Sequence, residues 1–202
     1  MRAKREFTCA AASLTGHASN VTGAAWTITT AKAGDGMAHQ ATVRNDSATD
    51  HSLKTIVLSG GDADGNAQTE TIAAPAGSAT VTSTKFWGWL DTATPSATIG
   101  ADTFDIGWAA AAVSPWLHVD WKQKPFSARV AVNIGGTINY DLEHTSDLDL
   151  PADAFYFTNA DIVGDTTDAE TIYTAPVAAV RARVNSHTAG TIALHVLQAE
   201  RN

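Results

Sequence analysis

Apolar and polar residues alternate along most of this 202-residue chain. The alternating runs are rich in Thr, Val and Ile and are bounded by Gly, Asn and Asp, whereas helical periodicity is hard to find. Successive side chains of a strand point to opposite faces, so short alternating runs are typical of strands that bury one face. The pattern predicts an all-β fold, with strands spaced as in sandwiches and barrels.

The clearest alternation lies in the second half of the chain. Apolar residues occupy alternate positions on both sides of Gly135-Gly136, and the same pattern recurs between residues 178 and 198. A Gly-Gly pair supplies the positive φ angles that a two-residue hairpin turn requires. We therefore predict two β-hairpins here, one that reverses at the glycine pair and one whose loop follows Val184.

The first half repeats this pattern less regularly, and a change of composition separates the halves. Strand candidates cover residues 24–31, 54–74, 78–90 and 101–108. The alanine run that follows loses the alternation, and Pro115 would interrupt a strand. We place a domain boundary near residue 113.

This boundary predicts an N-terminal arm and two small antiparallel β-sandwich or barrel domains of jelly-roll-like type. The arm covers residues 1–20, and the domains cover residues 21–113 and 114–202. A single sandwich, in which the alanine-rich segment is a crossover, is the alternative.

The charge composition argues against a nucleic acid partner. The formal net charge is −8, and the basic cluster of the chain consists of Arg2, Lys4 and Arg5. Binding to a phosphate backbone requires clustered Lys and Arg. Charged residues make up only 17% of the chain, which suits a protein that hides surface in an assembly.

Cysteine content and hydropathy indicate the compartment. The single cysteine, Cys9, cannot form an intrachain disulfide. Polar residues interrupt the N-terminal segment, so no signal peptide is predicted. The longest apolar run, residues 108–113, is far shorter than the roughly twenty residues of a membrane helix. We expect synthesis and folding in a cytosol and no membrane partner.

Residues 60–70 read GGDADGNAQTE and raise the question of a calcium site. Asp62, Asp64 and Asn66 have the spacing of the first three ligands of an EF-hand loop. The sixth and twelfth positions, however, are alanine, where such a loop requires glycine and glutamate. An Asp-Gly pair between two strand candidates is typical of a hairpin turn. We predict a turn and keep the three residues as a weak metal candidate.

No catalytic constellation is recognisable in the sequence. The seven histidines lack metal-ligand spacing, and GxSxG, P-loop and GxGxxG motifs are absent. Asp147, Asp149 and Asp153 lie in loop-like sequence, where carboxylates are usually solvated. We predict a non-enzymatic protein without a cofactor.

Four tryptophans are interface candidates, together with the basic cluster. Trp87 and Trp89 alternate in KFWGWL and are predicted to share one face of a strand, while Trp116 and Trp121 bracket LHVD. Rows of aromatic side chains anchor protein interfaces and also hold the pyranose rings of sugars. We interpret the four as core or subunit-interface residues, with sugar binding as the alternative.

Longer stretches of the chain resemble a known family. The segment LSGGDADGNAQTETIAAPAGSATVTSTKFWGWL is similar to a module of tailed-bacteriophage virion proteins, in which a GDADGN turn is followed by TETI and a further strand. The segments SPWLHVDWKQKPFSARVAVNIGGTINYDLEHT and APVAAVRARVNSHTAGTIALHVLQA resemble the closing domain of the same proteins. The resemblance covers roughly residues 55–202 and does not extend to the first 50.

This resemblance implies a non-enzymatic structural component of a tailed-phage virion. Low charge and many small residues favour a capsid decoration or cement protein, which binds the major capsid protein and itself as a homotrimer or homodimer. The basic N-terminal arm would reach an acidic capsid surface. A tail-tube or head-to-tail connector protein is the alternative, and a carbohydrate-binding module on the virion surface is a further one.

Overall fold

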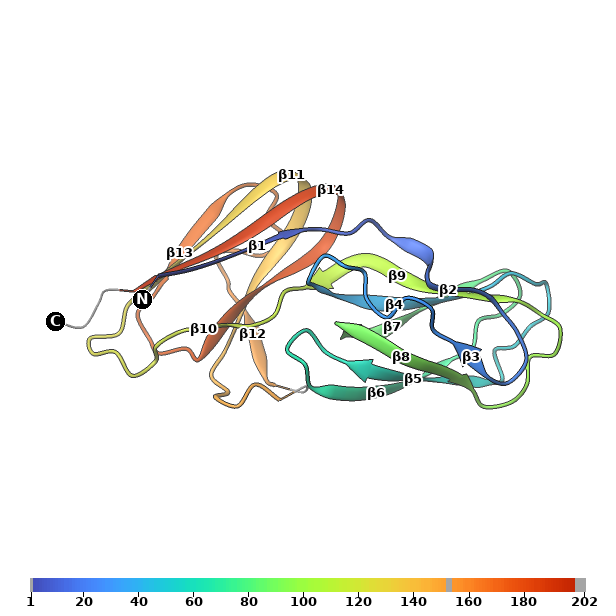
Figure 1. Ribbon diagram of the computed structural model, residues 1–202. Coiled ribbons are helices and arrows are strands. Elements are labelled where there is room, and N and C mark those ends of the chain that lie inside the picture. The colour runs from blue at the N-terminus through green and yellow to red at the C-terminus, as the bar shows by residue number, and fades with distance from the viewer. Residues whose placement is uncertain (1, 152–153, 199–202) are drawn as a thin grey trace. The chain divides into compact units, whose positions relative to one another are not determined.

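The computed structural model describes residues 2–151 and 154–198, and every regular element among them is a β-strand (Figure 1). The all-β prediction is therefore confirmed. The strands are β1 (Arg2–Thr8), β2 (Ser13–Val21), β3 (Trp26–Thr27), β4 (Ala38–Asn45), β5 (Thr55–Gly61), β6 (Ala67–Ala73), β7 (Thr80–Trp87), β8 (Trp89–Pro95), β9 (Phe104–Val113), β10 (Leu117–His118), β11 (Ala128–Thr145), β12 (Tyr156–Thr158), β13 (Ala169–Tyr173) and β14 (Ala179–Gln198). Within the described ranges, no helix is long and apolar enough to cross a membrane.

The chain divides into two compact units. The terminal unit comprises Met1–Ala10 and Ala110–Asn202, and the central unit comprises Ala11–Ala109. The division falls inside β9, because the alanine run continues this strand to Val113. The predicted boundary near residue 113 thus coincides with the end of a strand, and the alanine run is not the interruption that its composition suggested.

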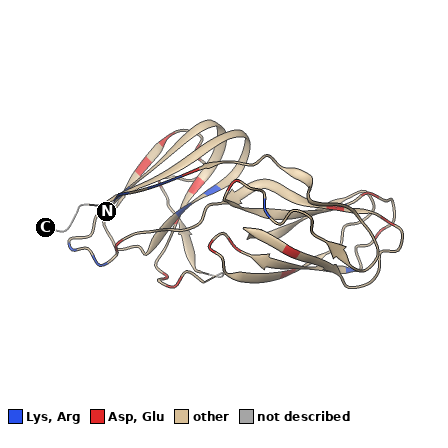
Figure 2. Cartoon of the chain, in the orientation of Figure 1, with Lys and Arg blue, Asp and Glu red and all other residues tan. Residues whose placement is uncertain are grey.

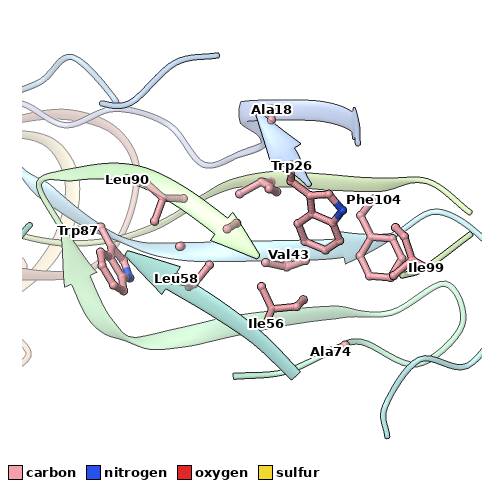
Figure 3. Close-up of a cluster of buried hydrophobic side chains, with 13 residues drawn as sticks. Ala18, Trp26, Val43, Ile56, Leu58, Ala74, Trp87, Leu90, Ile99 and Phe104 are labelled. Carbon is pink, nitrogen blue, oxygen red and sulfur yellow. The ribbon is translucent and has the colours of Figure 1, made fainter. Parts of the chain in front are cut away.

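The central unit is a two-layer β-sandwich. One layer contains β2, β9, β4 and β7, and the other has the order β3-β8-β5-β6. Side chains from both layers form one hydrophobic core, in which Leu58, Leu90 and Phe104 are fully buried (Figure 3). Burying an apolar side chain of this size stabilises a fold by about 1.5–3 kcal/mol. The core therefore accounts for the alternation seen in this half of the sequence.

The terminal unit is built on two long strands, and both hairpin predictions for it are wrong. β11 and β14 are continuous strands of 18 and 20 residues, which pair antiparallel with each other along their lengths. The pairing begins with Ala128 opposite Gln198 and ends with Thr145 opposite Ala179. Neither the glycine pair nor the segment after Val184 reverses the chain.

Glycines instead mark a corner in this two-stranded ribbon. Gly136 lies opposite Gly190, and their φ angles of +101° and +149° are rarely adopted by other residues. The register shifts twice between Thr137 and Tyr140. Glycines and bulges allow a strand to bend sharply. The ribbon consequently has different neighbours on its two sides of the corner: β13 and β1 on one, and β12, β10 and β9 on the other.

Residues 1–20 do not form the single N-terminal arm that was predicted. β1 pairs antiparallel with β14 along its whole length, from Arg2 to Thr8. β2 begins at Ser13 and pairs with β9 in the central unit. Residues 2–8 therefore form an edge strand of the terminal unit. Charged side chains are common on edge strands, because they oppose unwanted pairing with other chains.

Candidate functional site

The outer face of the terminal unit's sheet carries a row of exposed side chains. Arg129 on β11 pairs with Leu197 of β14 on one side and with Ile172 of β13 on the other. Arg2 of β1 extends the row, because it pairs with Leu197. Leu197 and Ile172 are 54% and 61% exposed. We call these four residues the exposed row; it alternates cationic and apolar side chains across four strands.

A shallow hollow of about 430 Å³ lies on this face. The residues that line it are Arg2, Ala3, Arg129, Ala131, Asn133, Glu170, His195, Val196 and Leu197. Arg129 forms an ion pair with Glu170, and both side chains are more than half exposed. Solvent screens such a pair strongly, so it contributes little to folding. The Arg129 side chain is accordingly accessible to a partner.

The basic residues of β1 do not form one cluster. Arg2, Lys4 and Arg5 are all exposed, but the pleat of the strand places Arg5 on the face opposite to the other two. Lys4 forms an ion pair with Glu6 at 2.8 Å, and this hydrogen bond holds the pKa of the Glu6 carboxyl below its usual value. Charged positions are sparse on most of the other strands (Figure 2).

Trp116 and Trp121 have different surroundings. Trp116 is only 3% exposed, and the guanidinium of Arg181 lies 4.3 Å from its ring centroid and 4.8 Å from that of Tyr156. Trp116 is therefore a buried residue and not an interface anchor. Trp121 is 41% exposed, with the ammonium group of Lys122 at 5.2 Å from its ring, and stays an interface candidate.

A buried ion pair fixes Arg181 in this position. Its Nε donates a hydrogen bond to the carboxylate of Glu143 at 2.6 Å, and the Glu143 side chain is fully buried. Arg183 approaches the other carboxylate oxygen at 3.4 Å. Sequence reasoning missed this group, because all three residues occupy the positions that alternate with the apolar ones and are expected to face solvent.

Three consecutive aromatic residues form an exposed group that the sequence analysis did not single out. Phe155, Tyr156 and Phe157 are 69%, 41% and 51% exposed. The rings of Phe155 and Phe157 meet edge to face, and that of Phe157 stacks on His144. Burial lowers the pKa of the His144 ring, because desolvation disfavours its charged form. Burial also raises the pKa of the neighbouring Tyr173 hydroxyl to about 12.

One of the predicted loop carboxylates, that of Asp147, is bonded to the backbone near these aromatics. Asp147 accepts a hydrogen bond from the backbone N–H of Phe155 at 2.7 Å. Asp149 lies in a bend of the same loop, and Asp153 lies outside the described residues. Asp147 and Asp149 thus lie in a loop, as predicted.

The Asp62 carboxylate organises the turn between β5 and β6. Its Oδ1 accepts hydrogen bonds from the backbone N–H groups of Asp64 and Asn66, at 2.9 and 2.8 Å, and its Oδ2 accepts one from the Asn66 side chain at 2.9 Å. Gly65 has a φ of +97°. The predicted hairpin is confirmed. Among the residues that the structure describes, no group of three or more His, Cys, Asp or Glu side chains is placed to hold a metal ion.

Replacing Asp62 by alanine is expected to lower the free energy of unfolding by about 1–3 kcal/mol, because the turn loses three hydrogen bonds to a charged acceptor. Urea denaturation measures this loss. Millimolar calcium is expected to leave the melting temperature of the wild-type protein unchanged. A rise in melting temperature that chelation reverses would instead assign the loop to metal binding.

Trp87 and Trp89 do not share one face of a strand. β7 ends at Trp87 and β8 begins at Trp89, and the two strands belong to opposite layers of the sandwich. Trp87 is a core residue, and its Nε1 donates a hydrogen bond to Ser83 at 3.2 Å. Trp89 is partly buried, and its ring lies against Gly61, where a Cβ atom would be 2.0 Å from the ring. Gly88 is thus the point at which the chain changes layer.

The structure brings Trp89 together with Asp62 and Asp64. All three line a second hollow, of about 440 Å³, in the central unit. Lys32 lines the same hollow, and its Nζ lies 5.8 Å from the centroid of the Trp89 ring. Asp62 and Asp64 belong to the weak metal candidate and Trp89 to the interface candidates, and the sequence gives no sign that these two groups meet.

Comparisons of the chain with protein-family models, with curated proteins and with solved structures gave no match. The resemblance to virion proteins stays a prediction, and the function has to be argued from the surfaces described above.

Proposed function

We propose that this chain is a non-enzymatic structural component of a tailed-phage virion, and that it is a decoration protein which binds the outer surface of the major capsid protein and stabilises the head. The observation that carries the proposal is the exposed row of the terminal unit. A protein that works by covering another protein needs such a surface, which combines apolar contacts with charges that direct the partner.

The distribution of exposed apolar side chains supports binding through the terminal unit. Among the described residues, the large exposed apolar side chains of the central unit are Leu14, Leu53 and Val57. Those of the terminal unit are Trp121, Leu148, Phe155, Tyr156, Phe157, Val163, Ile172 and Leu197. Exposed apolar groups that gather on one part of a protein usually mark an interaction site.

The charges on the row favour an acidic partner surface. Arg2 and Arg129 stand in the row itself, and Lys4 lies on the same face of β1. Glu6 and Glu170 on the same face form ion pairs with Lys4 and Arg129. This face therefore carries charges of both signs, whereas the chain as a whole has a net charge of −8. Complementary charge increases the association rate and fixes the orientation of the partner.

Removing the two apolar side chains of the row is expected to weaken shell binding at least tenfold. The double variant Ile172→Thr, Leu197→Thr loses the apolar contacts of the row. Because both side chains are exposed, the free energy of unfolding should change by no more than about 0.5 kcal/mol. The measurement is titration of purified protein onto phage particles that lack it. Leu53→Thr is the matched control, since Leu53 is fully exposed in the central unit.

Two outcomes contradict the decoration role. If the double variant binds the shell as tightly as wild type and the Leu53 control, the exposed row is not the capsid-binding surface. If particles without the protein release DNA at the same temperature as wild-type particles, the protein does not stabilise the head. Sedimentation of the free protein tests the predicted homotrimer or homodimer.

A further inference from the structure

The hollow beside Trp89 has the dimensions and the composition of a small-ligand site. Its volume of about 440 Å³ lies within the range of ligand pockets. The side chains of Lys32, Asp62, Asp64 and Trp89 line it. Four glycines also line it, so backbone N–H and C=O groups are accessible beside the charged side chains.

The walls of this hollow are held in place by buried interactions. On one side, the Asp35 carboxylate accepts a hydrogen bond from the backbone N–H of Met37 at 3.0 Å and lies 2.9 Å from Nε2 of His39. The side chains of Asp35 and His39 are only 4% and 2% exposed. The other ring nitrogen of His39 is 2.9 Å from the Ala109 carbonyl. The segment from Gly34 to Met37 is therefore anchored to the sandwich.

The opposite wall is the turn that Asp62 organises, and it fits closely against Gly88. A Cβ atom at Gly88 would lie 2.2 Å from the backbone oxygen of Asp62, so only glycine permits this approach. Trp89 follows directly, with its ring against Gly61 and its Nε1 bonded to the Asp91 carboxylate at 3.0 Å. The aromatic ring is thus fixed in orientation before any ligand binds, which reduces the entropic cost of binding.

The chemistry of the lining selects for an uncharged polyol. An aromatic ring offers its face to the C–H groups of a sugar, while an ammonium group and carboxylates offer a donor and acceptors to hydroxyl groups. Lys32 is opposed by Asp62 and Asp64, so the site has no excess of positive charge with which to hold a phosphate. Both oxygens of Asp62 already accept hydrogen bonds from the turn, which disfavours a metal ion.

We propose that this hollow binds one neutral pyranose residue of a saccharide, which lies on the face of Trp89 and forms hydrogen bonds with Lys32 and Asp64. This site lies wholly in the central unit, whereas the proposed capsid contact lies in the terminal unit. The two proposals therefore succeed or fail separately. A glycan on a cell surface and a free oligosaccharide would present the same chemistry.

The test uses the full-length protein with a panel of methyl glycosides of neutral hexoses and N-acetylhexosamines, followed by an array of free and immobilised oligosaccharides. Saturation-transfer NMR and tryptophan fluorescence report binding. We expect millimolar affinity for a single sugar residue and tighter binding to some oligosaccharides. Comparison of the immobilised with the free oligosaccharides distinguishes a cell-surface glycan from a free oligosaccharide as the ligand. Failure of the whole panel and the array to bind, with unquenched fluorescence, overturns the proposal.

Three variants locate the site. Trp89→Ala is expected to weaken binding about tenfold or more, whereas Trp121→Ala, which removes an exposed tryptophan of the terminal unit, should leave it unchanged. Lys32→Ala should weaken binding severalfold and cannot harm the core, since Lys32 is exposed. Saccharide binding that survives both Trp89→Ala and Lys32→Ala, or that chelation of calcium abolishes, would contradict the assigned site.

Discussion

Gly190→Ala is expected to lower the free energy of unfolding by about 3 kcal/mol or more. A Cβ atom there would lie 2.1 Å from the backbone oxygen of Gly135, and φ at this position is +149°. Backbone overlap and an unfavourable φ each cost about 1–3 kcal/mol, and the corner between β11 and β14 cannot open without breaking ladder hydrogen bonds. Urea denaturation followed by tryptophan fluorescence measures the loss.

Gly135→Ala is the matched control for the corner. A Cβ atom at Gly135 would meet only the hydroxyl of Thr191, at 2.9 Å, and that side chain can rotate away. We expect a loss below about 1 kcal/mol, within the usual range of a tolerated surface substitution. Equal losses in the two variants, or no loss in Gly190→Ala, would mean that Gly190 does not approach the backbone of Gly135 closely at this corner.

Glu143→Gln is expected to cost about 3–5 kcal/mol of unfolding free energy. The Glu143 carboxylate is fully buried against Arg181, whose side chain is 14% exposed. Removing one charge of a buried pair leaves the other charge desolvated and uncompensated. Guanidinium chloride denaturation gives the stability, and the fluorescence of Trp116 reports the local change, because its ring lies beneath the Arg181 guanidinium.

Glu170→Gln provides the comparison, because Glu170 forms the same kind of pair with Arg129 on the surface. Both of these side chains are more than half exposed, so the loss should be below about 1 kcal/mol. If Glu143→Gln lowers the free energy of unfolding no more than Glu170→Gln does, then solvent or another group compensates the charge of Arg181 in the variant.

The all-β fold class could be predicted from the sequence. The Gly135-Gly136 pair alone, however, did not distinguish a hairpin turn from a corner within one long strand. In a two-residue hairpin at Gly135-Gly136, residues 134 and 137 would face the same side, so the apolar positions would change from even to odd numbers. Instead Val132, Tyr140 and Leu142 are all buried and all even. This unbroken alternation indicates one continuous strand, and the sequence contained that signal.

Other strands were missed because polar side chains occupy buried positions in them. β4 has buried residues on both faces, among them the polar His39 and Asn45. The Asn45 amide donates to the carbonyls of Thr49 and Ala76 and accepts from Ser47, so its burial is compensated. Such compensation depends on tertiary contacts, which local alternation does not encode.

The candidate sites show the same division between local and tertiary information. The turn at Asp62 follows from Asp-Gly chemistry, and the sequence predicts it correctly. The meeting of Asp62 with Trp89 depends on the pairing of Gly61 with Trp89 across β5 and β8. The exposed row likewise combines residues of four strands, β1, β11, β13 and β14, which are far apart in the sequence. Neither arrangement has a local sequence signal.

Cryo-electron microscopy of phage particles from cells that produce this protein tests the proposed virion role. A decoration protein should appear in many copies on the outer surface of the head, with the faces of β1, β14, β11 and β13 that carry Ile172 and Leu197 turned toward the capsid protein. Density for this fold in a tail ring or tube, or its absence from the particle, would overturn the proposed role.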